Sequence, residues 1–343
     1  MTCPAPRRVP VLGAVARLAT LAIGLACLPP AMLAQTPPPA RPLNVIATIK
    51  PIHALAAAVL GDVARPGLLI DGAASPHTYA LKPSQVRGLN AASAVLMVSD
   101  DLETFMIKVA ASLPKTVRTV RLDSAPGLTR LPVREGGLYE QDDHDHGHAG
   151  HDHDHEKKSA AKKSGGPSSP PMDAHLWLDP ENGKAILAHL AAVFADLDPA
   201  HKATFESNAR AAAGRLDQLQ KDLVRDLQPV AGKPFLVFHD AYQYFERRFG
   251  LTSAGSITVN PEVQPGAKRL KALRDRMEQG GAVCVFAEPQ FEPKLVATLI
   301  NGTKVRKGTL DPVGAALPAG PDAYEGVLRG LAAELRGCLG GTS

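Results

Sequence analysis

Short apolar segments alternate with longer amphipathic ones along most of the chain. The apolar runs predict strands at residues 43–49, 94–98, 116–122, 235–238 and 282–287. The amphipathic stretches predict a helix near residue 53 and helices at 84–92, 102–112, 241–249, 264–279, 292–300 and 322–337. Short apolar strands separated by helices are typical of parallel sheets. The pattern therefore predicts two α/β halves, although no clear sequence repeat relates them.

Two segments depart from this alternation. Residues 136–171 consist of Gly, His, Asp, Lys, Ser and Pro with almost nothing apolar, which predicts a disordered insert. Helical patterning resumes at 181–196, and a long helical stretch follows at 199–227, with Pro199 well suited to a helix start. We expect this stretch to be a rigid link between domains. The expected organisation is an N-terminal α/β domain at 42–198, a linking helix at 199–228 and a C-terminal α/β domain at 229–343.

The N-terminus has the pattern of a secretory signal peptide over residues 1–34. Two arginines begin it, an apolar run covers residues 9–28, and small residues lead to an expected cleavage site after Ala34. Arg17 and several prolines leave the run too short and too broken to span about 30 Å of hydrocarbon. The sequence thus predicts export to the periplasm, with lipidation of Cys27 as the alternative.

Composition narrows the possible functions. The formal net charge is +4, but three of the 38 basic residues and none of the 34 acidic ones lie in the first 34 positions. The nearly neutral remainder, with 4% aromatic residues, argues against a nucleic-acid-binding protein. Cleavage leaves two of the four cysteines, Cys284 and Cys338. An even pair in an exported protein predicts a disulfide, and a thiolate metal pair is the alternative.

Half of the 12 histidines fall in one short stretch of the predicted insert. They are His144, His146, His148, His151, His153 and His155. Neutral imidazole is the commonest side-chain ligand for zinc, copper and nickel, so the stretch is predicted to be an accessory loop that binds several ions weakly. The alternative is a solvated linker with no metal role.

Three other histidines have contexts suited to a binding site. His77 lies in a loop rich in Ser, Pro and Gly, His175 directly precedes a predicted helix, and His239 follows a predicted strand. In open α/β sheets, ligands bind at the carboxyl ends of strands, so two halves could share one ion between them. The large separations along the chain leave this open on spacing alone.

Six motifs in order carry a family resemblance. They are SPHTYALKPSQ (75–85), DAHLWLDPEN (173–182), FHDAYQYFERRFGL (238–251), TVNPEVQPGAKRL (258–270), CVFAEPQFEP (284–293) and GTLDPVG (308–314). Together they resemble the cluster A-I metal-binding solute proteins of ABC importers over about residues 42–338. The similarity is greatest to the periplasmic zinc-binding members, in which a His-rich acidic insert also lies between the first two histidine motifs. The cysteine pair matches the disulfide of that group.

The resemblance implies two pseudo-symmetric α/β domains with parallel-type sheets, joined by one long rigid helix, with one metal ion in the interdomain cleft. The ligand positions of the family fall on His77, His175 and His239, and the carboxylate position falls on Asp311. Pro76 stands where some zinc members carry Glu, so the fourth ligand is either Asp311 or water. A histidine at position 239, where manganese-type members have a carboxylate, favours Zn(II).

Three acidic residues near these motifs receive supporting roles. Glu288 and Glu262 are candidates to orient a metal-bound imidazole through a hydrogen bond, as such histidines usually require. The alternative for Glu288 is a helix-entry residue before Pro289. Asp240, beside His239, is expected to be a helix N-cap.

The implied function is capture of Zn(II) in the periplasm and delivery to an inner-membrane ABC permease and its ATPase, by a monomer without catalytic activity. One alternative is a manganese- or iron-binding solute protein of the same family. A zinc-storage protein or adhesin is another. A zinc hydrolase is a further alternative, because three His plus water is a catalytic zinc pattern; however, the sequence contains no HExxH motif.

Overall fold

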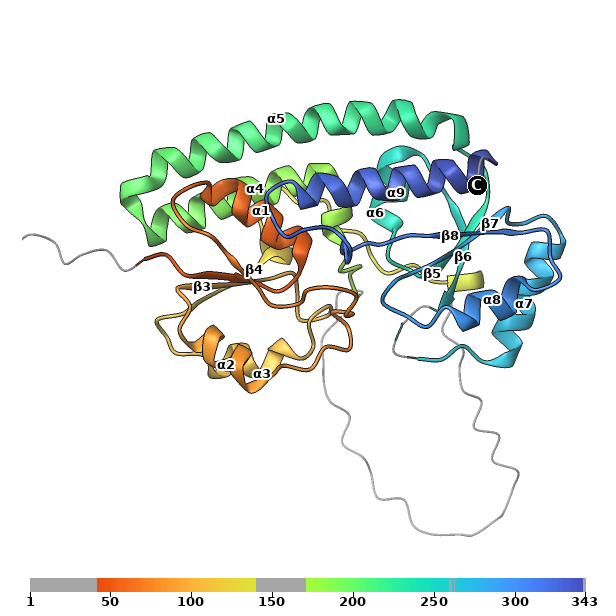
Figure 1. Cartoon of the computed structure of the whole chain (residues 1–343), viewed down its shortest axis with the longest axis horizontal. Helices are drawn as coiled ribbons and strands as arrows, with labels where there is room; N and C mark the ends of the chain where they lie inside the picture. Colours follow the sequence, from red (N-terminus) through yellow and green to blue (C-terminus); the bar gives the residue numbers. More distant parts are fainter. Residues whose placement is uncertain (1–41, 140–170, 259–260, 262, 342–343) are drawn as a thin grey trace, which may run out of the picture. The chain divides into compact units, whose positions relative to one another are not determined.

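Two four-stranded parallel sheets form the framework of the protein (Figure 1). The computed structural model describes residues 42–139, 171–258, 261 and 263–341. The first sheet has the order β2-β1-β3-β4, from β1 (Val45–Ala47), β2 (Gly67–Leu68), β3 (Ala94–Met97) and β4 (Arg118–Arg121). The second has the order β6-β5-β7-β8, from β5 (Phe235–His239), β6 (Ser253–Thr258), β7 (Cys284–Ala287) and β8 (Arg306–Thr309). The two orders are equivalent, which confirms the predicted pair of α/β halves.

The strands differ in how strongly their sequences predict them. All residues of the inner strands β3, β5 and β7 are buried, and their apolar runs were predicted as strands. Strands β6 and β8 were not predicted, because Ser253–Thr258 is rich in Ser and Gly and Arg306–Thr309 is largely polar. Both occupy sheet edges, where a strand bonds one neighbour and needs fewer apolar side chains.

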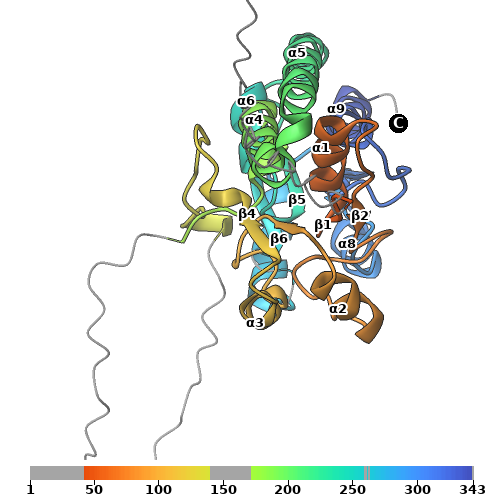
Figure 2. The same cartoon turned by 90° about the vertical axis from the view of Figure 1, so that its left-hand side faces the viewer.

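Helices cover both faces of each sheet. Figures 1 and 2 show α1 (Lys50–Leu60) and α4 (Pro180–Leu197) on one face of the first sheet, and α2 (Pro83–Asn90) and α3 (Met106–Ser112) on the other. The helices of the second half are α6 (Gln243–Phe249), α7 (Ala267–Glu278), α8 (Lys294–Ile300) and α9 (Ala323–Gly340). Among the described residues, no helix combines the length and the apolar character that a membrane crossing requires.

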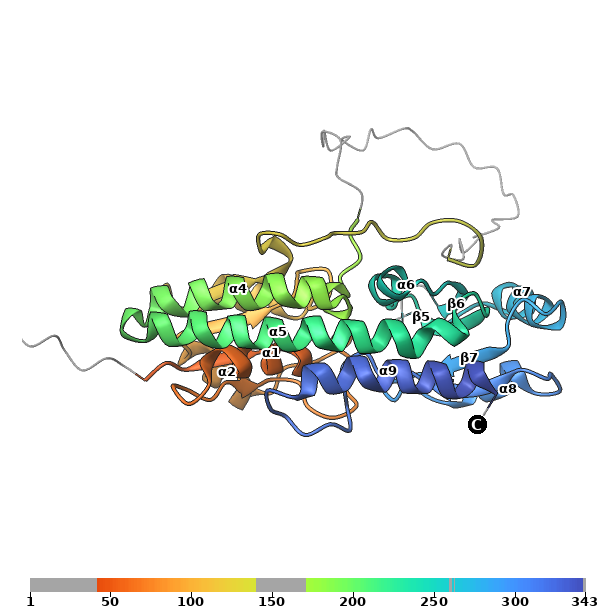
Figure 3. The same ribbon diagram turned by 90° about the horizontal axis from the view of Figure 1, so that it is seen from above.

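The long helix α5 (Lys202–Leu227) packs against both halves. Its buried residues recur at intervals of three or four: Phe205, Ala209, Ala212, Leu216, Leu219, Leu223 and Leu227. This face contacts α1 and α4 at one end and α9 toward the other, and Figure 3 shows α5 between α4 and α9. Its 26 residues span about 39 Å. Short 3-10 turns at Pro199–His201 and Gln228–Val230 extend it at both ends. The long helix expected at 199–228 is therefore present.

The predicted insert at 136–171 differs from the structure at both of its edges. Gly137–Tyr139 form a 3-10 turn, and the Tyr139 hydroxyl donates a hydrogen bond to the Ser253 carbonyl (2.8 Å). The Val133 N–H donates to the carbonyl of Pro171 (3.0 Å). These edge residues are thus held by specific contacts, which composition alone did not indicate. The histidines of the stretch 144–155 and the predicted signal peptide lie outside the described residues.

The predicted disulfide is present between Cys284 and Cys338. It joins β7, an inner strand of the second sheet, to the last turns of α9, and 54 residues separate the two cysteines. The cross-link therefore restricts about half of the C-terminal half in the unfolded chain.

Replacing both cysteines with serine is expected to lower the free energy of unfolding by about 4 kcal/mol, because the unfolded chain regains the entropy of a long loop. Urea denaturation of the oxidised protein and of the Cys284→Ser, Cys338→Ser variant measures the difference. Wild-type protein unfolded with a reductant is the control and should match the variant. Equal midpoints for oxidised wild type and variant would contradict the prediction.

Candidate metal centre

Three histidines from separate segments converge on one point. His77 lies in the loop between β2 and α2, His175 directly precedes the 3-10 turn Leu176–Leu178, and His239 is the last residue of β5. The Nε2 atom of His175 lies 3.3 Å from that of His77 and 3.2 Å from that of His239. One ligand atom from each lies within 4.8 Å of the others, so the group can hold a metal ion. The structure thus brings together the three histidines that sequence analysis selected.

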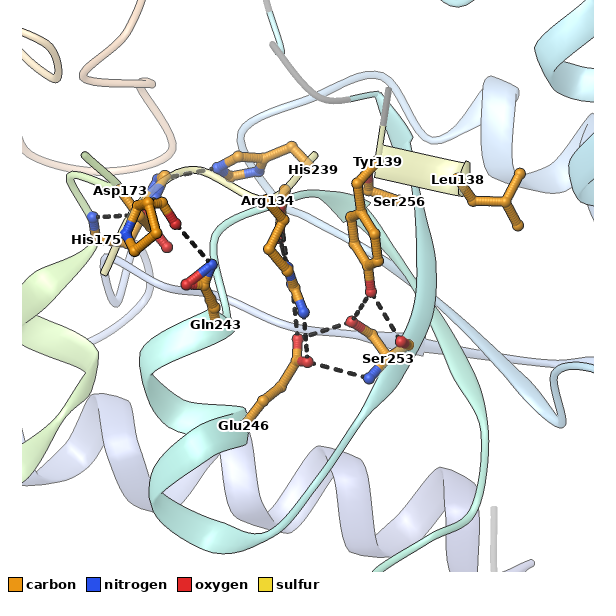
Figure 4. A network of polar contacts seen from close by, with 12 residues as sticks. Arg134, Leu138, Tyr139, Asp173, His175, His239, Gln243, Glu246, Ser253 and Ser256 are labelled. Atoms are coloured by element: carbon orange, nitrogen blue, oxygen red, sulfur yellow. Dashed lines mark hydrogen bonds and ion pairs between the residues drawn. The ribbon is translucent and has the colours of Figure 1, made fainter. Parts of the chain in front are cut away.

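Carboxylates orient two of these rings through Nδ1, the ring nitrogen that does not face the shared point. Asp173 Oδ1 lies 2.9 Å from Nδ1 of His175, and Glu288 Oε1 lies 2.7 Å from Nδ1 of His239. Figure 4 shows His175 with Asp173 and His239 beside it. Because a carboxylate only accepts hydrogen bonds, Nδ1 of each ring carries the proton and Nε2 keeps its lone pair. Both rings therefore direct an available donor nitrogen toward the shared point.

Glu288 and Asp173 owe their positions to the fold. Glu288 directly follows β7, the neighbour of β5. The parallel pairing therefore places Glu288 beside His239, at the carboxyl ends of the two strands. Asp173 lies two residues before His175 and also accepts from the backbone N–H of His175 (2.9 Å). Sequence analysis had named Glu288 as a candidate for this position. It overlooked Asp173, whose only signal was its place in the motif DAHLWLDPEN.

The surroundings shift the pKa values of two of the histidines in opposite directions. Burial lowers the pKa of His77 well below 6.5, and positive charge on His175 or His239 would lower it further. Burial also opposes protonation of His239, but the Glu288 carboxylate outweighs it through charge and hydrogen bonding, so the pKa of His239 is raised. Without a metal ion, His239 is therefore the ring that takes up a proton more readily than His77.

The histidines line a small cavity of about 10 Å³, which suits one water-sized occupant. Apolar rings form part of its wall: Trp177 lies 5.3 Å from His175 between ring centroids, and Phe291 lies 5.9 Å from His239. The Trp177 indole donates to the Pro312 carbonyl (2.8 Å), which fixes one side of the wall. The cavity therefore favours a single small ion over an organic ligand.

Asp311 lies beside this cavity but outside the histidine group. Its carboxylate accepts hydrogen bonds from the backbone N–H groups of residues 313–315 at 2.6 to 3.2 Å, and from Gln290 Nε2 at 2.9 Å. Buried Lys50, at the start of α1, donates to three carbonyls of the same loop, those of Gly314, Ala315 and Leu317. In this structure the Asp311 carboxylate holds the loop at residues 312–315, two residues of which line the cavity.

The remaining predicted residues have different outcomes. Asp240 is not the N-cap of α6, which is Tyr242. The prediction was wrong because the Asp240 carboxylate is bound by Arg134, a residue more than 100 positions away in the sequence. Glu262 lies outside the described residues, as do the histidines of 144–155, so their roles remain predictions.

Comparison with known proteins assigns the chain to a family. The sequence model of ZnuA, described as the periplasmic component A of the zinc-uptake complex, matches residues 45–338. The chain belongs to the ZnuA family. This assignment groups it with substrate-binding transport proteins rather than with enzymes.

Individual relatives agree with the ZnuA assignment. The chain is 46% identical over 305 residues to the high-affinity zinc uptake system protein ZnuA of Brucella abortus, covering 86% of this chain and 91% of the relative. It is 37% identical over 314 residues to ZnuA of Yersinia pestis, covering 90% and 96%. A crystal structure of a ZnuA deletion mutant with zinc bound superposes with a TM-score of 0.67 at 25% identity, covering 87% of this chain and 98% of that one.

The geometry predicts how the metal-free histidines titrate. A Glu288→Gln variant keeps the shape of the side chain but removes the negative charge, so the pKa of His239 should fall toward or below 6.5. NMR titration of the imidazole resonances in metal-free protein measures this shift. A Glu292→Gln change, at an exposed position four residues further along, is the control and should leave the His239 titration unchanged. An unaltered His239 pKa in Glu288→Gln would contradict the assigned contact.

Proposed function

We propose that this protein captures Zn(II) with His77, His175 and His239 and delivers it to an ABC importer of the inner membrane. The observation that carries the proposal is the convergence of three Nε2 atoms, with neighbouring pairs 3.2 and 3.3 Å apart. Two of the three rings are already oriented by carboxylates for donation. The names of the relatives, high-affinity zinc uptake system proteins, support zinc as the cargo.

The spacing of the nitrogens fits zinc chemistry. A tetrahedral ion with Zn–N distances of 2.0–2.1 Å requires its ligand nitrogens to lie about 3.3 Å from one another. The separations of the His175 nitrogen from those of His77 and His239 match this value. Manganese and magnesium prefer oxygen ligands, whereas three imidazoles suit zinc. The donor set therefore favours Zn(II) over the manganese alternative.

We propose water as the fourth ligand. The Asp311 carboxylate accepts hydrogen bonds from the backbone of residues 313–315, and Asp311 is not among the residues that line the cavity. Pro76, next to His77, has no donor side chain. A bound water completes the tetrahedron of a zinc site with three protein ligands without a change in the loop at residues 312–315.

The protein acts in the periplasm, as the family description supports. We propose that residues 1–34 are its export signal, cleaved after Ala34, and that the mature chain works as a monomer with an inner-membrane permease and its ATPase. The six histidines of residues 144–155 serve as an accessory that gathers zinc, separate from the transport site. No acid–base group for catalysis is part of this proposal, because delivery requires only binding and release.

Calorimetric titration of metal-stripped mature protein with zinc tests the site. We expect one tight site in the wild type and in a variant with all six histidines of residues 144–155 changed to Gln. We expect no tight site when His77, His175 and His239 are all changed to Ala. The six-histidine variant is the matched control, because it removes more imidazoles without touching the cavity.

Loss of tight binding in the six-histidine variant, with retention in the triple alanine variant, would reverse the proposed roles. A tight site that prefers Mn(II) in the same titration would instead favour the manganese alternative.

Zinc affinity is expected to decrease as the pH falls. Each ligating imidazole must be neutral, so protons compete with the ion. The raised pKa of His239 means that this competition begins above pH 6.5, whereas the lowered pKa of His77 keeps that ring neutral to lower pH. Zinc competition assays against a chelator of known pH dependence, run from pH 8 to pH 5, measure the effect. A constant affinity over this range would contradict a three-histidine site.

A further inference from the structure

Residues 131–139, here called the strap, connect the two halves at the candidate metal centre. The strap leaves the N-terminal half and lies against α6 and β6 of the C-terminal half (Figure 4). The Leu131 N–H donates to the hydroxyl of Tyr244 on α6 (3.0 Å), and Gln243 Nε2 donates to the Pro132 carbonyl (3.1 Å). At its far end, Tyr139 contacts Ser253 of β6. The strap is thus bonded to the second half along its whole length.

Arg134 is the central contact of the strap. Its guanidinium donates to both oxygens of Asp240 (Nε at 3.0 and 3.1 Å) and to both oxygens of Glu246 (2.8 and 3.2 Å). The two carboxylate side chains are 6% and 5% exposed. The Arg134 guanidinium also lies over the Tyr139 ring, 4.1 Å from the ring centroid. Arg134 thus neutralises two buried carboxylates of the other half, and only a planar, forked cation can bind both this way.

Each end of this contact network leads to a histidine of the cavity. Asp240 is the residue after His239, so the ion pair fixes the backbone turn that ends β5. On the other side, the Asp173 N–H donates to the Leu131 carbonyl (2.9 Å), and the Tyr244 hydroxyl donates to the Asp173 carbonyl (3.0 Å). Asp173 in turn orients His175. The strap therefore fixes the positions of the backbone segments that carry His175 and His239.

We propose that Arg134 is a positioning residue for metal capture: through Asp240 and the strap, it fixes the separation of the His175 and His239 nitrogens. The chelating geometry of these two rings depends on this particular tie between the two halves, made by Arg134 and the strap. Weakening the tie lets the two nitrogens separate and lowers their joint affinity for an ion. This inference rests on the proposed zinc function.

Two substitutions in the full mature chain test it. Arg134→Lys keeps the positive charge but cannot bind both carboxylates through a fork, and Arg134→Met removes the charge. We expect zinc affinity to fall about tenfold in Arg134→Lys and further in Arg134→Met, since partners outside the ligand shell typically change affinity by 10- to 100-fold. Arg134→Lys keeps the test valid if Arg134→Met does not fold.

Arg248→Met is the matched control. Arg248 also lies on the contact between α6 and another segment and also makes a two-pronged ion pair with a buried carboxylate, that of Asp179 at 2.8 Å, but Asp179 caps α4 instead of adjoining a cavity histidine. The second readout is the visible spectrum of bound Co(II), which reports the coordination geometry and is insensitive to stability alone. We expect an altered spectrum in both Arg134 variants and an unaltered one in Arg248→Met.

Three results would overturn the inference. Wild-type affinity and spectrum in both Arg134 variants would remove the positioning role. Equal losses of zinc affinity in the Arg134 and Arg248 variants, with unaltered Co(II) spectra, would show that Arg134 contributes only to general stability. The variant with His77, His175 and His239 changed to Ala separates the two proposals, because retention of wild-type binding there would refute the zinc site itself.

Discussion

The apposition of three imidazole nitrogens is the constraint on which the rest of the structure depends. Each ring must present its Nε2 atom to the same point, so the rings must be held in place by other contacts. Asp173 and Glu288 provide these contacts by binding the opposite nitrogen of two rings. Each histidine comes from a different segment, so the group forms only when the loop after β2, the entry to α4 and the end of β5 are all in place.

Much of the framework could be predicted from the sequence, because the inner strands and the long helix have unmistakable patterns. Continuous apolar runs identify β3 and β7, and spacing of three and four residues identifies α5. The edge strands β6 and β8 were missed, since a strand with one bonded neighbour needs no apolar run. The histidines of the cavity were found through motifs. Their proximity, however, depends on tertiary contacts between distant segments, which local sequence patterns do not predict.

A contact over a long sequence distance explains why the assignment of Asp240 was wrong. Asp240 was assigned to a helix start, the usual role of an Asp in that context, but a guanidinium from residue 134 takes its carboxylate. Asp311, whose role as a ligand stays a prediction, accepts hydrogen bonds from the backbone of its own loop. Lys50 satisfies three carbonyls of that loop from the other half of the protein. Each of these partners is set by tertiary structure, which a linear reading does not supply.

The disulfide between β7 and α9 also affects which ligands zinc can find during maturation. Thiolates are strong zinc ligands, and Cys284 and Cys338 are the only cysteines after residue 34. Once they are joined, this part of the chain has no thiolate left to compete with its imidazoles. Oxidation before metal capture thus leaves the imidazoles without competition from a thiolate in this part of the chain.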